Sequence, residues 1–247
     1  MRLSLLLWFR LCSLSRPGFI AIEFFQCLGF TSLIKIMSEE KKFDFIIGGA
    51  GIVGCAVAIE LQRKFKNSRI LLIEKEGTCG LHQTGHNSGV IHSGIYYEPA
   101  SLKSENCING YNDLLEFCAK HGVDFKITGK VIASRNSNEF DTIELLYNRA
   151  KEVGLNGVKV LTSRSSIEYY EPFLKVSGGL FVPQTGVVDY KAVCDRMIEI
   201  FESKGGKILY NTEILNHSDT SVETTQGKFN FSQLILALGL QSDSALC

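Results

Sequence analysis

The sequence has no excess of either charge, no closely spaced cysteine pair and no long uninterrupted apolar run. Its 247 residues include 26 lysines and arginines and 26 aspartates and glutamates, so the formal net charge is zero. A neutral surface has no strong field that would attract nucleic acid or anionic lipid. The charge balance therefore argues against a nucleic-acid partner.

Eight cysteines are present, but none forms a Cys-x-x-Cys pair. A chain of this length can build a core without disulfides, so we expect reduced and partly buried thiols. Cys79, His82 and His86 have a spacing that could supply three zinc ligands. Because a closed structural zinc site normally needs four ligands, we expect no metal.

The first 37 residues are apolar, with four basic side chains and one acidic side chain. This composition favours a mitochondrial transit peptide, with a secretory signal over residues 3–9 as an alternative. A membrane anchor needs about 20 consecutive apolar residues. Arg10 and Arg16 interrupt the stretch, which leaves membrane association as a lesser alternative. A start at Met37, before a polar run, predicts a cytoplasmic location instead. In each case residues 1–40 are a targeting or non-native leader outside the fold.

A nucleotide-binding β-α-β pattern follows this leader. Residues 43–47 form a short apolar run typical of a buried parallel strand. Gly49, Gly51 and Gly54 match G-x-G-x-x-G, and residues 55–65 have the pattern of a helix with one buried face. A second apolar run over residues 69–73 ends at Glu74, 20 residues after Gly54.

Each part of this pattern has a chemical reason. Gly49 permits a tight turn, Gly51 lets the backbone approach a pyrophosphate, and Gly54 lets helix and strand pack closely. The start of the helix offers unpaired N–H groups to phosphates. Glu74 can accept hydrogen bonds from ribose hydroxyls, and its charge would repel the 2′-phosphate of NADP. The cofactor-binding residues expected from this unit are Gly49, Gly51, Ile52, Val53, Gly54, Glu74 and Lys75.

A polar loop over residues 80–97 comes next, where a simple NAD dehydrogenase would continue into a helix and strand. Loops of this length tend to be functional. With the β-α-β unit, this loop resembles the D-amino-acid-oxidase-like superfamily of FAD-dependent oxidoreductases. Within that superfamily, residues 83–97 (Q-T-G-H-N-S-G-V-I-H-S-G-I-Y-Y) resemble the L-2-hydroxyglutarate dehydrogenase family. The similarity extends from about residue 43 to about residue 243.

The resemblance implies an α/β, glutathione-reductase-like FAD-binding (Rossmann-type) domain with part of an α+β substrate domain. It implies FAD as cofactor and oxidation of L-2-hydroxyglutarate, a small 2-hydroxy dicarboxylate, to 2-oxoglutarate by hydride transfer to flavin. Electrons then pass to an acceptor that the sequence does not identify. We expect a leader over 1–40, the β-α-β unit and flavin loop over 41–100, a partial substrate domain over 101–185, and a return to the FAD-binding domain over 186–247.

The resemblance also implies roles for individual residues. Four residues of the loop are expected to contact FAD: Thr84, His86, Asn87 and Ser88. His92 is the candidate general base, because a neutral imidazole can accept the substrate hydroxyl proton as hydride leaves the adjacent carbon. His86 is the alternative base, and a structural hydrogen-bonding role stays open for His92.

Two later residues are candidates for the cofactor site. Ile214 is expected near the adenine, and Gly239 follows a strand that returns beneath the cofactor; a packing role is equally open for both. The other predicted elements are helices over 102–120, 139–153 and from Asp189 to 204, a turn-like element over 165–172, strands over 129–134, 178–183, 207–214 and 234–238, and a hairpin over 221–231.

Members of the superfamily continue well beyond the last residue, so we expect a truncated form or a fragment. No cluster of arginine or lysine that could clamp a dicarboxylate is visible in the middle section. Two other functions stay open. One is a related FAD enzyme acting on an amino acid or glycerol phosphate. The other is a non-catalytic truncated module that binds a nucleotide or a partner.

Overall fold

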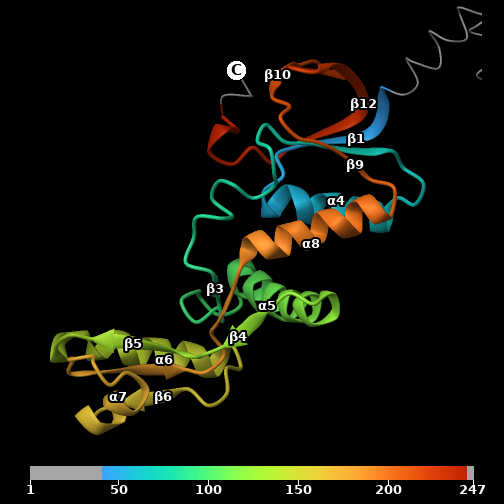
Figure 1. The fold of residues 1–247 in the computed structure, drawn as a ribbon. Helices are drawn as coiled ribbons and strands as arrows, with labels where there is room; N and C mark the ends of the chain where they lie inside the picture. The colour runs from blue at the N-terminus through green and yellow to red at the C-terminus, as the bar shows by residue number, and fades with distance from the viewer. Residues whose placement is uncertain (1–40, 244–247) are drawn as a thin grey trace, which may run out of the picture.

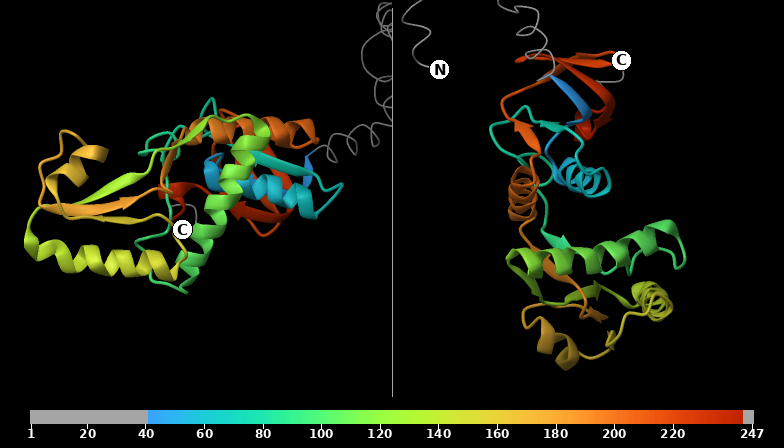
Figure 2. Two further views of the ribbon diagram at one scale, coloured as in Figure 1. Left: turned by 90° about the horizontal axis from the view of Figure 1, so that it is seen from below. Right: turned by 90° about the vertical axis from the view of Figure 1, so that its right-hand side faces the viewer.

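The computed structural model describes residues 41–243, so the expected leader lies outside the described residues. The first and last parts of the described chain share one large sheet, and the middle part extends away from it (Figures 1 and 2). No helix among the described residues is both long and apolar enough to cross a membrane.

The large sheet has the strand order β10-β11-β12-β1-β2-β9. Four of its strands are parallel: β12 (Gly227–Leu236), β1 (Lys42–Gly48), β2 (Ile70–Ile73) and β9 (Lys207–Leu209). All four residues of β2 are buried. An apolar run of this kind is required where a strand is covered on both faces.

Two helices cover one face of this sheet, side by side in Figure 1: α4 (Ile52–Lys64) and α8 (Tyr190–Ser203). Ile47 of β1 is buried against them together with Ala58 and Phe201. Its neighbour Ile46 is buried on the opposite face with Val222, because successive strand residues point to opposite sides. That face is covered by the antiparallel strands β10 (Ile214–His217) and β11 (Ser221–Thr224).

A small sheet connects the large sheet to the middle section. Its order is β3-β8-β4, with β3 (Val90–Ile91), β8 (Gly186–Val188) and β4 (Phe125–Ile127). Helix α5 (Leu102–His121) contributes Cys118 to the core beside this sheet, and it ends at Gly122 in the left-handed conformation. The sheet thus joins one strand from each of the three sections expected after the leader.

The middle section holds a third sheet of order β5-β7-β6. Its antiparallel strands are β5 (Lys130–Ser134), β7 (Gly178–Val182) and β6 (Lys159–Leu161). Helix α6 (Phe140–Glu152) buries Ile143 and Leu146 against this sheet, and α7 (Arg164–Tyr170) packs against β7, where the ring of Tyr170 stacks on that of Phe181. Two short 3-10 helices, η1 (Ser137–Glu139) and η2 (Gly239–Gln241), complete the described elements.

Three predicted elements differ from the structure. The turn-like element at 165–172 is the helix α7, because Ser163 and Ser166 form a capping box at its start. The strand predicted over 207–214 ends at Leu209, and β10 begins at Ile214. The segments 228–231 and 234–238 belong largely to the single strand β12, which pairs with β11 at its start and with β1 from Asn230 to Leu236.

The five described cysteines are unpaired. Cys55, Cys79, Cys118 and Cys194 are buried, and Cys107 is half-buried. Burial raises the pKa of the Cys118 thiol. These residues are packed as small apolar side chains, which is the role expected for reduced thiols in a core.

Candidate functional site

The candidate cofactor residues gather where the parallel strands end. Ala237, after β12, donates its N–H to Gly48 (2.8 Å), and Gly49, after β1, donates to Ile73 (2.8 Å). Thr212, after β9, donates to the carbonyl of Glu74 (2.9 Å). In open parallel sheets, ligands bind at this carboxyl edge.

The glycine loop (residues 49–54) has geometry that side chains would disturb. Gly49 has φ +95°, and a Cβ there would lie 2.4 Å from the carbonyl oxygen of Ala237. A Cβ at Gly54 would lie 1.8 Å from the carbonyl oxygen of Gly49. At Gly51 the nearest atom would be Thr84 Oγ1, at 3.4 Å. The protein therefore needs Gly49 and Gly54 for its own packing, while the space beside Gly51 is open to a ligand.

Helix α4 directs its amino terminus at this open space. Its N-cap, Gly51, has no side chain to accept a hydrogen bond, and its first turn contains no acidic residue. Thr84 Oγ1 accepts the N–H of Ile52 (3.0 Å), so this loop residue caps the helix. With the N–H of Ile52 already paired, the positive end of the helix dipole at Val53 still favours a phosphate.

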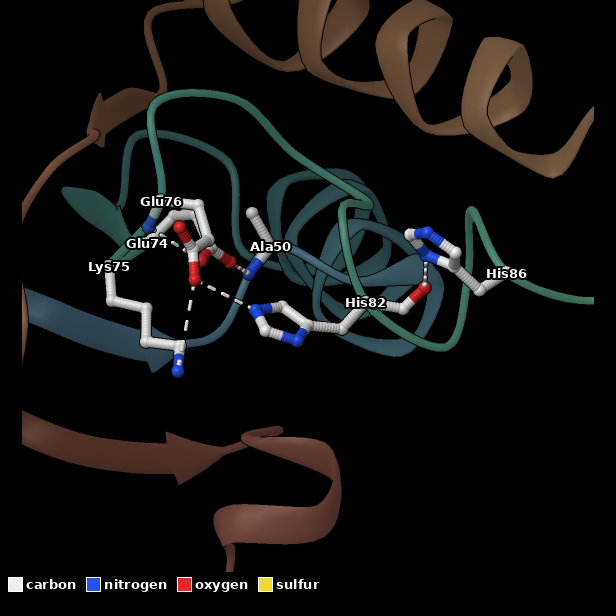
Figure 3. Close-up of polar contacts among 6 residues, drawn as sticks. All are labelled: Ala50, Glu74, Lys75, Glu76, His82 and His86. Carbon is white, nitrogen blue, oxygen red and sulfur yellow. Dashed lines mark hydrogen bonds and ion pairs between the residues drawn. The ribbon is translucent and has the colours of Figure 1, made fainter.

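Glu74 is fixed at the end of β2 and is only 7% exposed. Its Oε2 accepts the N–H of Ala50 (2.7 Å) and its Oε1 accepts the N–H of Glu76 (3.0 Å), as Figure 3 shows. These bonds tie the glycine loop to the second strand. An ionised carboxylate has about four acceptor positions, so Glu74 keeps capacity for ribose hydroxyls.

Glu76 is a further charged residue at this edge that sequence reasoning missed. Its Oε1 lies 2.9 Å from His82 Nε2 and 3.8 Å from Lys75 Nζ (Figure 3). Lys75 is thus paired with Glu76 in the free protein, and its contact with the cofactor stays a prediction. The available signal was the Glu-x-Glu spacing after the strand, which places two acids on one short turn.

The loop residues predicted to contact FAD also hold the loop itself together. Asn87 Nδ2 donates to the carbonyl of Thr84 (2.6 Å), and its Oδ1 accepts the N–H of Gly89 (2.7 Å). His86 Nδ1 lies 3.0 Å from the carbonyl oxygen of His82. Ser88 is exposed. The contacts of these side chains with FAD stay a prediction.

His92 lies apart from the Glu74 cluster, one residue after β3. Its carbonyl accepts a weak hydrogen bond from Cys107 Sγ of α5 (3.5 Å). Although His92 is exposed, its partial desolvation and, secondarily, the charge of Lys130 lower the pKa of His92 below its usual value. The imidazole is therefore neutral at neutral pH, which is the form that can accept a proton.

Cys79, His82 and His86 do not converge on one point. Cys79 Sγ lies 3.1 Å from Asp195 Oδ1, inside the core, while His82 contacts Glu76. Within residues 41–243, no group of three His, Cys, Asp or Glu side chains could hold a metal ion.

Two more predicted residues lie at the same edge. A Cβ on Gly48, the last residue of β1, would be 2.7 Å from Ile214 Cδ1, so Ile214 covers the end of that strand. Gly239 has φ +61° and no neighbour within 4 Å of an added Cβ. The backbone at Gly239 is consequently open, as it is at Gly51.

A parallel sheet with a glycine turn, a hydrogen-bonded glutamate after the second strand and a long polar loop defines a flavin-dependent oxidoreductase of the Rossmann type. Comparison with known proteins agrees, since residues 44–247 match the FAD dependent oxidoreductase (DAO) family. The chain belongs to this family, whose cofactor is FAD. The predicted superfamily, fold class and cofactor are confirmed.

Curated relatives support the narrower resemblance. An L-2-hydroxyglutarate dehydrogenase of Indibacter alkaliphilus is 37% identical over 205 residues, which are 81% of this chain and 51% of that protein. A mitochondrial L-2-hydroxyglutarate dehydrogenase of Caenorhabditis elegans is 39% identical over 211 residues, or 82% of this chain and 48% of that protein. The chain spans about half the length of the curated relatives it matches.

Solved structures share the fold. An L-alpha-glycerophosphate oxidase from Mycoplasma pneumoniae with FAD bound has a TM-score of 0.71 and 25% identity, covering 78% of this chain and 53% of that one. A glycine oxidase from Geobacillus kaustophilus has a TM-score of 0.69 and 21% identity, covering 80% and 55%.

Proposed function

We propose that the whole protein is an FAD-dependent dehydrogenase that oxidises L-2-hydroxyglutarate to 2-oxoglutarate. The observation that carries this proposal is the 37–39% identity to proteins named L-2-hydroxyglutarate dehydrogenase across four fifths of the chain. The substrate is assigned to the whole protein because the chain spans about half of those relatives.

The carboxyl edge of the large sheet fits FAD. The open backbone at Gly51 and the amino terminus of α4 would hold the pyrophosphate, and Glu74 would accept hydrogen bonds from the adenosine ribose. Ile214, which lies beside Gly48, would contact the adenine, and the open backbone at Gly239 would lie beneath the cofactor. When bound, FAD supplies the hydride acceptor.

The flavin loop would contact FAD through Thr84, which lies beside the glycine loop, and through His86, Asn87 and Ser88. The lowered pKa of His92 supports its role as the general base. At neutral pH its ring would accept the hydroxyl proton of the substrate as the carbon-bound hydrogen leaves with its electron pair. His86, whose Nδ1 is engaged by the backbone of its own loop, is the weaker candidate.

We also propose a mitochondrial location. Some curated relatives are mitochondrial, including the one from Caenorhabditis elegans, whereas others are bacterial. The basic, serine-containing leader supports import, and a start at Met37 would remove it. Fluorescent fusions with and without residues 1–36 distinguish the two locations.

The proposed reaction is tested by anaerobic mixing of the FAD-loaded protein with substrates. We expect L-2-hydroxyglutarate to bleach the oxidised flavin absorbance, and its D enantiomer, glycerol phosphate and amino acids to leave it unchanged. If one of the other substrates bleached the flavin instead, the protein would have a different activity within the same family. Bound flavin that no substrate reduces would favour the non-catalytic module.

A further inference from the structure

Lys130, the first residue of β5, is a half-buried cation that lacks an acidic partner. Its Nζ lies 4.2 Å from the centre of the Tyr96 ring. No carboxylate of residues 41–243 lies within ion-pair distance of it. Burial lowers the pKa of Lys130. A charge held partly out of water without a counterion is unfavourable, so this position calls for an anion from outside the described chain.

Strand register brings Lys130 toward His92. In the small sheet, Ile91 and Ile127 both pair with Gly186 of the central strand β8. One step further along each antiparallel pair, His92 and Thr128 flank Thr185. The carbonyl of Thr185 accepts the N–H groups of Thr128 (3.1 Å) and Gly129 (2.8 Å). The chain therefore turns from β4 into β5 at Thr185, beside the end of β3.

Thr185 supplies a second unpaired polar group at this turn. It is 3% exposed, and its Oγ1 has no hydrogen-bond partner within the described part of the chain. Ser93, next to His92, is also 3% exposed with an unpaired hydroxyl. Buried hydroxyls are normally hydrogen-bonded, and each exception requires an explanation.

The backbone of Tyr96, whose ring Lys130 contacts, is held by a second basic residue. Arg149 of α6 donates to the carbonyl of Tyr96 (3.1 Å). Lys130 is also close enough for its charge to act on two groups across the turn: it lowers the pKa of His92 and opposes the burial that raises the pKa of Cys107. One cation, one imidazole and two unpaired hydroxyls thus lie around the turn at the end of the small sheet.

The substrate has two carboxylates, one of which is attached to the carbon that carries the hydroxyl. We infer that Lys130 and Thr185 bind this carboxylate, next to His92. This inference rests on the proposed function, because it assigns a binding site for that reaction. In a 2-hydroxy acid the carboxylate and the reacting carbon are directly bonded. A cation and a hydroxyl donor that hold the carboxylate beside His92 would therefore present the substrate hydroxyl to the base. The cation gains its counterion and the hydroxyl gains an acceptor.

The test compares Lys130→Met with Lys126→Met in the full-length, FAD-loaded protein. Both changes remove one lysine charge, but Lys126 is exposed on β4. Binding of L-2-hydroxyglutarate and of 2-oxoglutarate is measured by calorimetry, and flavin reduction by rapid mixing. A charge-assisted hydrogen bond corresponds to roughly a 10- to 100-fold change in affinity. We expect Lys130→Met to raise Kd and KM by about that factor and Lys126→Met to leave both within about twofold.

Two further variants separate binding from folding. Lys130→Arg keeps the charge and should retain most of the affinity, while Thr185→Val removes the hydroxyl at nearly constant volume and should weaken binding by about 3- to 10-fold. Flavin content and the unfolding midpoint are measured for each, and neither should fall, because the substrate-free protein leaves both groups without a partner.

The outcomes separate this inference from the proposed function. If the parent protein reduces its flavin with L-2-hydroxyglutarate and Lys130→Met does so with an unchanged KM, the carboxylate site is wrong and the proposed function stands. If the parent binds dicarboxylates without reducing its flavin, the proposed function fails, and loss of that binding in Lys130→Met still supports the site. If the parent binds neither compound, the inference is overturned.

Discussion

Gly51 and Gly54 belong to one motif, but their missing side chains leave room for different neighbours. A Cβ at Gly54 would collide with the backbone of Gly49, at 1.8 Å, inside the protein. A Cβ at Gly51 would make an ordinary contact with Thr84. Gly54 is consequently required by the fold, whereas Gly51 matters chiefly to whatever approaches the loop from outside.

Two matched substitutions should separate these roles. We expect Gly54→Ala to lower the free energy of unfolding by at least about 1–3 kcal/mol, because the added methyl group overpacks the turn. Gly51→Ala should change it by less than about 1 kcal/mol, as expected for an N-cap exchange, and should weaken FAD binding at least about tenfold. Urea titration of the flavin-free protein and quenching of flavin fluorescence measure the two effects. Parental FAD affinity in Gly51→Ala would mean that the pyrophosphate lies elsewhere.

His92 gives the proposed reaction a defined pH dependence. The base works only when neutral, so the rate of flavin reduction should fall as pH drops through the pKa of His92. Burial and Lys130 lower this pKa, so the fall should lie on the acid side of about pH 6.5, the ordinary value. Lys130→Met removes one cause and should move the fall to higher pH.

His92→Gln should reduce the rate by about 10²–10⁴-fold and abolish the acid limb, with bound FAD retained. Stopped-flow reduction across pH 5–9 provides the measurement, and His217→Gln on β10, away from the small sheet, is the matched control. A profile in His92→Gln that keeps both its rate and its acid limb would remove this residue from the chemistry.

Helix α4 depends on a loop residue for its start. Gly51 offers no side chain, and Thr84 Oγ1 accepts the N–H of Ile52 from 32 positions further along the chain. The cap therefore forms only when the flavin loop is folded against the helix, so the order of this loop is coupled to the order of the glycine loop.

Removing this cap should loosen both segments together. We expect Thr84→Val to destabilise the protein by about 1 kcal/mol, the usual effect of losing a helix cap, and Thr84→Ser to be close to neutral. Hydrogen exchange should rise at the first turn of α4 and in residues 80–89 in Thr84→Val. Faster exchange in only one of the two segments would show that they are not coupled through this bond.

The sequence predicted the strongly patterned elements of the fold. The strand, glycine turn, helix and second strand over residues 42–73 have their expected order, and Asp189 N-caps α8 as predicted, accepting the N–H of Lys191 (2.8 Å). Strands β4, β6 and β8 contain three residues each and were not predicted, because a run that short has no readable periodicity. The continuity of β12 was hidden because pairing with β1, rather than local pattern, holds it straight.

The candidate site was predictable only where its residues are close in sequence. The glycine loop and Glu74 form one local unit, so their spacing alone indicated a shared site. Lys130 and Thr185 could not be predicted, because one lysine and one threonine far apart in the sequence carry no signal of a binding site. The register of the small sheet, continued one residue beyond its last pairs, brings His92 and Thr185 to the turn that leads into Lys130.

The carboxyl edge of the large sheet, where we place the cofactor, contains residues from both ends of the described chain. Gly49 and Glu74 come from the first section, and Ala237 and Thr212 come from the last, joined by backbone hydrogen bonds at the ends of the strands. The middle section lies outside this edge (Figure 2). A ligand bound here would therefore contact both sections and link them thermodynamically.

FAD should accordingly stabilise the large sheet as a unit. A ligand that binds only the folded state at 100 times its Kd adds about 2.7 kcal/mol, which corresponds to a rise of roughly 5–10 °C in the unfolding midpoint for a chain of this size. We expect this rise to grow with the logarithm of FAD concentration, to be absent in Gly51→Val, and to be unaffected by Lys126→Met. Hydrogen exchange with and without FAD should show protection at residues 48–54 and at 237–239 together, because the two segments border one site. Protection of the first segment alone would mean that FAD is held by the β-α-β unit without the return strand β12.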